Sequence, residues 1–223
     1  LGLSLVSLRV VGYSFEYFPG DLGDGRLNLY FLEHAHLFFI GQIESFWNAP
    51  FMFPAENILA YSDNLLGTAP IYSVFRLLGV TTFAAYQLWF IALSALNFIA
   101  AFALVSHLFK DVRSASLGAF IFAFSLALHS QLLHAQTFPR FAIPLTILFA
   151  LRFLKNFKVK DYLWCLLLVV FQLFSGIYLG MMLSILTFFI FAVSLFNQRI
   201  EWITHLKEPK WLVQISLYSI LAL

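Results

Sequence analysis

Long apolar stretches separated by short charged ones dominate the pattern along the chain. The stretch from Thr82 to Phe109 contains no Asp, Glu, Lys or Arg and ends at the charged loop 110–113. A bilayer core about 30 Å thick needs roughly 20 predominantly apolar helical residues. We therefore predict a membrane-spanning helix over 82–109 and two further spans over 114–133 and 139–153.

The next apolar stretch, 162–196, is too long for one span and is interrupted at 175–176 and at Gly180. Two shorter helices in a hairpin fit it better. Residues 1–15 have the pattern of the end of an earlier span, and Trp211 begins another. Since both ends of the sequence fall inside apolar runs, we expect a fragment of a longer protein.

Composition supports a protein that lies in lipid. Of the 223 residues, 61% are hydrophobic and only 11% are charged, whereas about a quarter of an ordinary soluble domain is charged. A net charge of +2 provides no sustained basic face, which excludes a nucleic-acid binder. The single cysteine excludes a disulfide within the chain. We predict an all-α fold, a polytopic transmembrane helical bundle.

The positions of the basic residues predict an orientation. Cytoplasmic loops of membrane proteins are enriched in Lys and Arg. The segment 16–63 carries seven acidic residues and one base, Arg26, so its net charge of −6 places it outside. We predict three parts in the plasma (inner) membrane: the tail of a span (1–15), an outer loop with interfacial helices (16–81) and a helix bundle (82–223). Nine bases fall in three short loops that we assign to the cytoplasm: Lys110, Arg113, Arg152, Lys155, Lys158, Lys160, Arg199, Lys207 and Lys210.

Two helices are expected within the outer loop. Residues 28–40 have the apolar spacing of a helix that lies on a membrane surface. Ser62 and Asp63 have the side chains of an N-cap, which predicts a helix from there to about Leu78. Residues 79–81 then turn the chain into the span that begins at Thr82.

The first candidate for chemistry is an acidic, glycine-rich turn that contains Asp21 and Asp24. A carboxylate at the edge of low-dielectric lipid can serve as a general base. Two carboxylates three residues apart could instead share a divalent cation, Mg²⁺ or Mn²⁺. The alternative is an ordinary surface turn, because Asp and Gly are common turn residues.

A second polar cluster lies where the spans 114–133 and 139–153 meet outside. Polar residues within a span are costly and often functional, although those near its end can also anchor it at the interface. Thr137 is placed to cap the next helix, with Pro139 in its first turn. A helix N-terminus beside an arginine makes a phosphate site, and an arginine at the interface can equally anchor the helix. The cluster comprises His129, Gln131, His134, Gln136 and Arg140.

Other polar residues give weaker signals. His34 and His36 are two residues apart, which directs their rings to different faces of a helix. We therefore interpret them as surface histidines rather than as metal ligands. Asn97 in mid-span favours a bond to a neighbouring helix. Arg9, near the outer end of the first apolar run, should face a polar cavity.

The acidic turn and its surroundings resemble the GT-C superfold of polytopic glycosyltransferases, which use polyprenyl-phosphate-linked sugars, and in particular its bacterial members. The resemblance begins with a span followed by Pro19-Gly20-Asp21-Leu22-Gly23-Asp24 and covers roughly residues 10–180 as a pattern of spans. It continues through the segments 33–41, 46–51, 62–63, 70–72, 76–79 and 134–136.

The resemblance implies an inverting transfer at the outer face of the membrane, in which lipid phosphate leaves. Its catalytic acid, which deprotonates the acceptor hydroxyl or holds a metal, would be Asp24, with Asp21 as the second choice. Its partners would be membrane lipid and a polyprenyl-phosphate-linked sugar donor. Residues near the substrate or the leaving phosphate would be Arg140, His134, His129, Gln136 and Arg76, with Arg9 as a further candidate.

Two other functions are compatible with the pattern. A transporter or flippase of lipid-linked glycans would place polar residues at the bilayer midplane, where Asn97, Gln172 and the 175–176 pair are the candidates. A purely structural membrane subunit predicts that Asp24 does not approach the turn at 129–140. Convergence of that turn with Asp24 therefore distinguishes the interfacial enzyme from the structural subunit.

Overall fold

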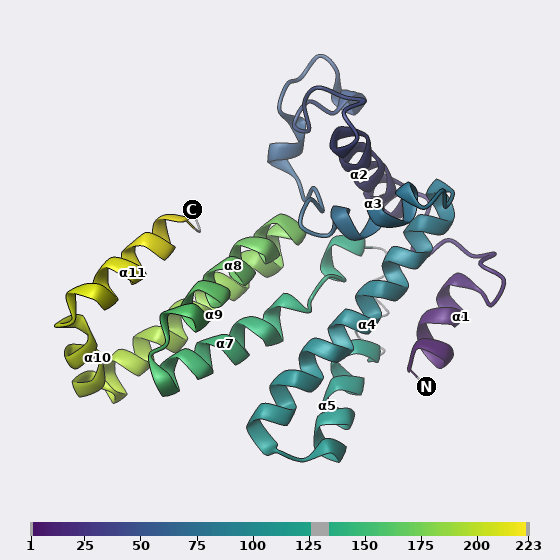
Figure 1. Cartoon of the computed structure of the whole chain (residues 1–223). Helices are drawn as coiled ribbons and strands as arrows, with labels where there is room; N and C mark the ends of the chain where they lie inside the picture. The colour runs from purple at the N-terminus through teal and green to yellow at the C-terminus, as the bar shows by residue number, and fades with distance from the viewer. Residues whose placement is uncertain (1, 126–133, 222–223) are drawn as a thin grey trace.

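In the computed structural model, which describes residues 2–125 and 134–221, all regular secondary structure is helical (Figure 1). Three helical stretches are long and apolar enough to cross a membrane: Thr82–Phe109, Ala135–Asn156, which joins a 3₁₀ turn and a helix, and Ile177–Asn197. These helices confirm the all-α class and indicate a membrane protein. The chain begins with helical turns at Leu3–Ser7 and α1 (Leu8–Val11), where the side chain of Arg9 is exposed.

Residues 16–81, which we call the outer segment after their predicted location, are built on two helices, α2 (Asp24–Phe39) and α3 (Ala69–Leu77). Helix α2 confirms the element expected over 28–40 and starts four residues earlier. The connection between α2 and α3 contains two 3₁₀ turns, η2 (Pro50–Met52) and η3 (Ile58–Tyr61). Figure 1 shows α2 and α3 together at one end of α4.

The prediction that Ser62 and Asp63 cap α3 is wrong. Helix α3 begins at Ala69, after Thr68, and has no side-chain cap. The Asp63 carboxylate instead accepts a hydrogen bond, 2.6 Å long, from the backbone N–H of Ile177. Ile177 is the first residue of α9, so Asp63 caps a helix that is 114 residues away in sequence.

The first long hairpin joins α4 (Thr82–Phe109) and α5 (Val112–Phe124), which pack side by side. Helix α4 begins at Thr82 as predicted, and α5 begins two residues before the predicted start at 114. The side chains of Thr81 and Asp111 accept hydrogen bonds from N–H groups in the first turns of α4 and α5. The span predicted over 114–133 is α5 up to Phe124. Its remaining part, 126–133, lies outside the described residues.

The next span differs from its prediction at the start. A 3₁₀ turn, η4 (Ala135–Thr137), precedes α7 (Ala142–Asn156), so the helix does not begin at Pro139 and Thr137 does not cap it. The Thr137 hydroxyl instead donates to the carbonyl of His134 within η4. Residues 138–141 between these elements are not helical.

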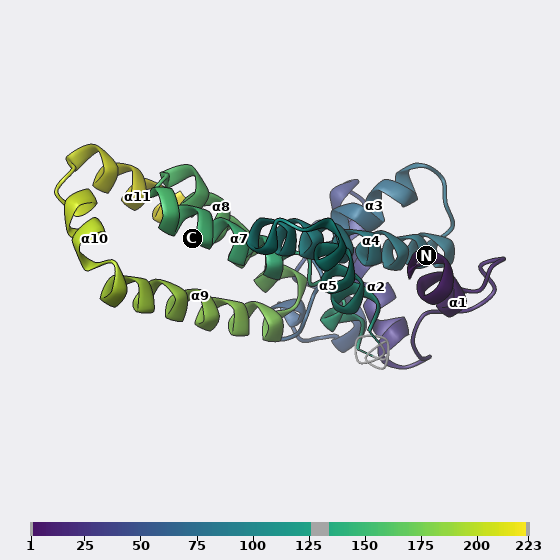
Figure 2. The ribbon, with the colours of Figure 1, turned by 90° about the horizontal axis from the view of Figure 1, so that it is seen from below.

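The apolar stretch at 162–196 forms the predicted helical hairpin. Helix α8 (Val159–Ser175) and α9 (Ile177–Asn197) are separated at Gly176. Gly180 lies inside α9 and does not interrupt it; a side chain there would meet the backbone of Leu173 at 2.5 Å. Figure 2 shows α9 continuing to α10 (Arg199–Leu206), where the chain turns back into α11 (Pro209–Leu221).

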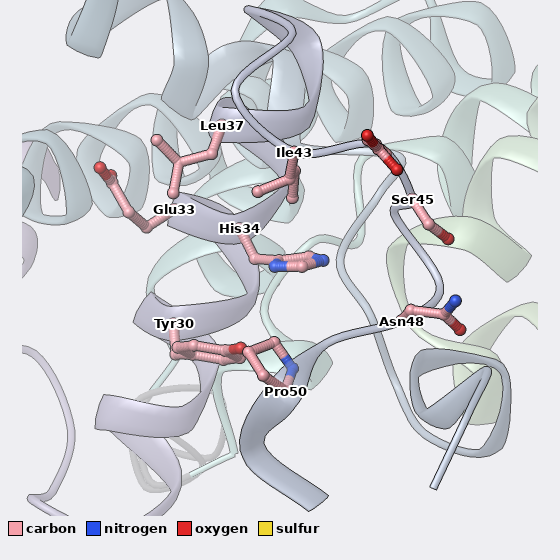
Figure 3. Close-up of a pocket in the computed structure, with 9 residues that line it drawn as sticks. Tyr30, Glu33, His34, Leu37, Ile43, Ser45, Asn48 and Pro50 are labelled. Atoms are coloured by element: carbon pink, nitrogen blue, oxygen red, sulfur yellow. The ribbon is translucent and has the colours of Figure 1, made fainter. Parts of the chain in front are cut away.

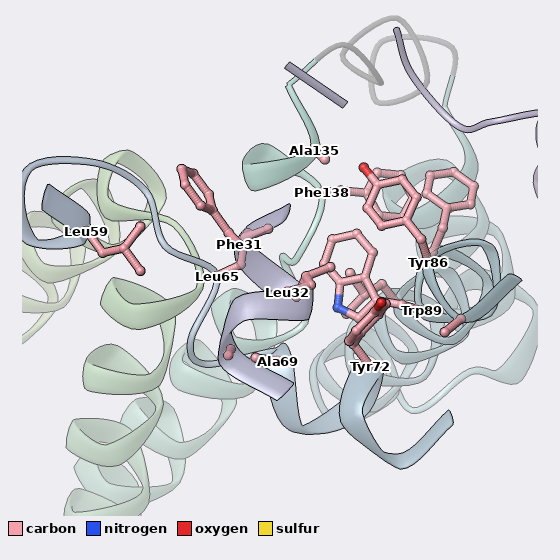
Figure 4. Packing of buried hydrophobic residues seen from close by; sticks show 14 of the residues in the cluster. Phe31, Leu32, Leu59, Leu65, Ala69, Tyr72, Tyr86, Trp89, Ala135 and Phe138 are labelled. Atoms are coloured by element: carbon pink, nitrogen blue, oxygen red, sulfur yellow. The ribbon is translucent and has the colours of Figure 1, made fainter. Parts of the chain in front are cut away.

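A buried cluster joins the outer segment to the bundle (Figure 4). It contains Leu32 from α2, Tyr72 from α3, Trp89 from α4, and Ala135 and Phe138 from the η4 region. Burying a large side chain contributes about 1.5 to 3 kcal/mol. This packing fixes the N-terminal half of α2 beside η4.

Candidate functional site

The two carboxylates of the acidic turn have different surroundings. Asp21 Oδ1 accepts hydrogen bonds from the N–H groups of Gly23, at 3.2 Å, and Gly25, at 2.9 Å. Gly25 must lack a side chain because a Cβ atom would lie 2.7 Å from the Phe18 ring. Asp21 therefore holds the start of α2, while Asp24, the first residue of that helix, has a half-exposed side chain.

Asp24 meets the second polar cluster. Its Oδ2 atom lies 3.2 Å from Nδ1 of His134, and each side chain is about half exposed. The Asn28 amide donates to the Asp24 carbonyl at 2.8 Å and to Oε1 of Gln136 at 3.3 Å. The expected convergence of Asp24 with the turn that contains His134 and Gln136 is thus present. His129 and Gln131 lie outside the described residues.

Two polar residues from neighbouring helices hold the non-helical segment after η4. The Asn97 amide donates to the Phe138 carbonyl, and its oxygen accepts from the Arg140 N–H, each at 3.0 Å. The Gln172 amide donates to the Pro139 carbonyl at 2.8 Å. Buried backbone groups outside a regular helix need hydrogen-bond partners from elsewhere in the protein. The prediction that Asn97 bonds a neighbouring helix is wrong in its partner, because Asn97 bonds the non-helical segment that precedes α7.

Arg140 lies between η4 and the N-terminus of α7. Its Nε donates to the carbonyl of Thr137 at 2.7 Å. That bond does not use the two terminal nitrogens of the guanidinium. Arg140 and His134 are thus carried by the same short segment. This placement is compatible with an anion held ahead of α7.

Arg76 is engaged elsewhere. Its guanidinium forms a bidentate pair with Glu33, with Nε–Oε2 and Nη2–Oε1 distances of 2.9 and 3.0 Å, and the Tyr72 hydroxyl donates to the same carboxylate. Glu33 is nine residues beyond Asp24 on α2, about 13 Å along the helix axis. The structure therefore does not bring Arg76 to Asp24.

Burial and these bonds act in opposite directions on the carboxyl of Glu33. Burial alone would raise its pKa, but the hydrogen bonds from Arg76 and Tyr72 and the charge of Arg76 outweigh that effect and lower it. The bond to Glu33 raises the pKa of Arg76 in turn. Neither Glu33 nor Tyr72 stands out in the sequence, because the partners are 39 and 43 residues apart.

A cavity of about 550 Å³ lies between α2 and the following loop (Figure 3). The Tyr30 ring stacks on His34 at 5.9 Å, and the Tyr30 hydroxyl is buried without a hydrogen-bond partner among the described residues. This cavity is separate from Asp24. Glu33, which lines the cavity, is nine residues from Asp24 and therefore projects from the opposite side of α2. The lining comprises Tyr30, Glu33, His34, Leu37, Ile43, Glu44, Ser45, Asn48 and Pro50.

The interpretation of His34 and His36 as surface residues is wrong. Each is only 5% exposed. His34 Nε2 lies 2.8 Å from the Phe46 carbonyl, and His36 Nδ1 lies 2.8 Å from the Ser73 hydroxyl. Both rings serve to attach other segments to α2, so they form no metal pair.

The described residues also offer no complete cation site. In residues 2–125 and 134–221, no group of three or more His, Cys, Asp or Glu side chains is placed to hold a metal ion. Asp21 directs one carboxylate oxygen into the backbone of its own turn. The described residues around Asp24 therefore do not complete a site for Mg²⁺ or Mn²⁺, and we derive no step through a cation.

Comparison of the chain with protein-family models, curated proteins and solved structures finds no match. Its chemistry must therefore be argued from the geometry. A half-exposed carboxylate beside an imidazole can accept a proton from a hydroxyl that approaches from the water side. The guanidinium of Arg140, carried by the same segment as the imidazole, can bind a phosphate oxygen.

Proposed function

We propose that the chain is a GT-C-like membrane glycosyltransferase. It transfers a sugar from a polyprenyl-phosphate-linked donor to an acceptor hydroxyl at the outer face of the plasma membrane. The contact between Asp24 and His134 carries the proposal, because it joins the acidic turn before α2 to the polar cluster before α7. A purely structural subunit predicts no such approach of Asp24 to this turn.

In the proposed reaction, Asp24 takes the proton of the acceptor hydroxyl. The hydroxyl oxygen attacks the anomeric carbon, and the bond from that carbon to the phosphate oxygen breaks on the opposite face. The electron pair of the broken bond leaves with the polyprenyl phosphate. Because attack and departure occur on opposite faces, the configuration at the anomeric carbon inverts. Arg140 lies near the departing phosphate, whose developing negative charge its guanidinium stabilises.

His134, Asp21 and Asn28 act as positioning residues in this scheme. The imidazole of His134 orients the Asp24 carboxylate from 3.2 Å. Asp21 fixes the turn from which Asp24 projects, and Asn28 ties that turn to η4 through Gln136. A general base must be held within hydrogen-bond reach of the proton it removes.

The buried polar residues favour this function over transport. Transporters carry their substrate sites near the bilayer midplane. Here Asn97 and Gln172, the midspan candidates, bind the backbone of residues 138–140. One hydrogen bond from each amide is thereby used in holding the segment that carries Arg140.

The test is transfer by the purified Asp24→Asn variant. The probes are polyprenyl-phosphate-linked mannose, glucose and galactose with a membrane lipid extract as acceptor, and release of polyprenyl phosphate is measured. We expect this variant to lose at least about 100-fold in rate, since general-base catalysis typically contributes that much. Glu56→Gln removes an exposed carboxylate of the same segment and should keep the wild-type rate. Full activity of the Asp24→Asn variant would overturn the assignment.

A further inference from the structure

A second cluster of charge lies at the turn between α7 and α8, apart from the site at Asp24. Arg152 comes from the end of α7, whereas Lys158 and Lys160 stand at the start of α8. These side chains line a cavity of about 510 Å³ together with Phe149, Asp161 and Trp164. Lys155 of the same turn lines a different cavity.

Arg152 is held in place but remains open to solvent. Its Nη2 lies 3.4 Å from Oδ1 of Asp161, whose side chain is only 6% exposed. The guanidinium carbon lies 5.4 Å from the centre of the Phe149 ring. The Arg152 side chain is nevertheless 46% exposed. A guanidinium fixed on one side and free on the other is suited to binding an oxyanion.

The positive charge of this cavity exceeds its negative charge. Three bases face one acid, Asp161, which gives a net charge of +2. The N-terminus of α8 adds a partial positive charge, so Lys158 and Lys160 lie where a helix disfavours cations. A bound anion would relieve this repulsion.

Aromatic rings form the remaining wall. Phe149 and Trp164 are stacked, with ring centres 6.0 Å apart, and Trp164 is 44% exposed. Tryptophan is enriched where membrane meets water. A free phosphate would contact only the basic residues, whereas a phospholipid would contact both the bases and the rings.

We propose that this cavity binds the headgroup of an anionic phospholipid. Arg152, Lys158 and Lys160 bind its phosphate, and Trp164 lies against the upper part of its acyl chains. Basic pockets on the cytoplasmic side of membrane helices are suited to such headgroups. In the orientation predicted from the distribution of Lys and Arg, the cavity faces the cytoplasmic leaflet.

The test uses the double variant Lys158→Gln/Lys160→Gln of the whole chain. Both lysines are exposed, so their replacement leaves the Arg152–Asp161 pair intact. The matched control is Lys207→Gln/Lys210→Gln, which removes the same charge from two exposed lysines that also flank a helix start and do not line the cavity.

The detergent-purified protein is first equilibrated with nanodiscs that contain phosphatidylcholine and phosphatidylglycerol. Native mass spectrometry then measures how much phosphatidylglycerol each variant retains. We expect the Lys158/Lys160 variant to lose about tenfold or more in apparent affinity and the control to match wild type. Short-chain phosphatidylglycerol should raise the unfolding temperature of the wild-type protein, and inorganic phosphate should not. Equal loss in both variants, no loss in either, or an equal effect of phosphate would overturn the proposal.

Discussion

Glu33 illustrates how single residues organise the outer segment. Its carboxylate accepts bonds from Arg76 and Tyr72 of α3, so one side chain of α2 attaches the next helix. Arg76 also donates to the carbonyl of Val80, just before α4 begins. This network therefore links three helices through one carboxylate.

We predict that Glu33→Gln destabilises the protein in a pH-dependent way. The pKa of Glu33 is lowered in the folded state. The contribution of its carboxylate to the free energy of unfolding is therefore fully present above the unfolded pKa of about 4.3, and it is lost as the pH falls through the folded pKa. At neutral pH the variant should lose about 1 to 2 kcal/mol, after allowance for partial exposure.

Unfolding temperatures in detergent, measured near neutral pH and below about pH 4, check this expectation. The difference between wild type and Glu33→Gln should shrink in acid, because the native carboxyl then becomes protonated as well. The exposed residue Glu56 provides the control, since Glu56→Gln should change little at either pH. A difference that stays constant with pH would contradict the role given to the Glu33 charge.

The histidines show where sequence reasoning stops at this scale. The spacing of His34 and His36 on one helix was sufficient to argue against a metal pair. Their burial was not predictable, because the groups they meet belong to Phe46 and Ser73, 12 and 37 residues away. Periodicity places a side chain on a face of its helix, but it does not say what covers that face.

At the scale of elements, helix starts were predictable only when the cap is local. Thr81 and Asp111 bond to N–H groups three residues ahead, which is the relation that a capping rule assumes. Asp63 has the same chemistry, but the helix that it caps comes from another part of the chain. Likewise α7 starts late because Asn97 and Gln172 already satisfy the backbone before it.

The long-range cap leads to a prediction about Asp63→Ala. Near Asp63, the N–H of Gly67 also donates to the carbonyl of Phe174, so this part of the outer segment is docked on the α8–α9 turn. Loss of a helix cap costs about 0.5 to 2 kcal/mol. We expect the Asp63→Ala variant to unfold at lower temperature and Asp63→Asn, which keeps an acceptor oxygen, to recover most of the loss.

Limited proteolysis separates this docking role from a general loss of stability. Cleavage within residues 40–68 should accelerate in the Asp63→Ala variant. Asp111→Ala removes a cap of similar strength from α5 and should leave that cleavage unchanged. Equal cleavage in the two variants would show that Asp63 does not hold the outer segment.

At the scale of the molecule, composition and length predicted the architecture well. Apolar stretches of sufficient length must be helical in lipid, since only helices satisfy their own backbone bonds there. Of the two predicted interruptions, 175–176 and Gly180, only the first separates α8 from α9; Gly176 sits against the Gln136 carbonyl and has no room for a side chain. The contact between Asp24 and His134 was anticipated only because both residues were predicted to lie on the same side of the membrane.

The distribution of charge leads to a prediction about orientation. In Figure 1 the α4–α5 loop lies at the end of α4 that is far from α2 and α3, as expected if the basic loops and the acidic segment face opposite sides. Gln42 in the outer segment and Lys207 between α10 and α11 are both exposed. We expect a membrane-impermeant maleimide to label Gln42→Cys in intact cells and to label Lys207→Cys only after permeabilisation.

The native sequence suits this measurement, because its one cysteine, Cys165, is buried and should give no background. The wild-type chain is therefore the control in both conditions. The same result bears on both proposals, since Asp24 must face the donor at the outer surface while Lys158 and Lys160 must face the cytoplasmic leaflet. Labelling of Lys207→Cys, and not of Gln42→Cys, in intact cells would show that the protein has the opposite orientation, with the acidic turn on the cytoplasmic side.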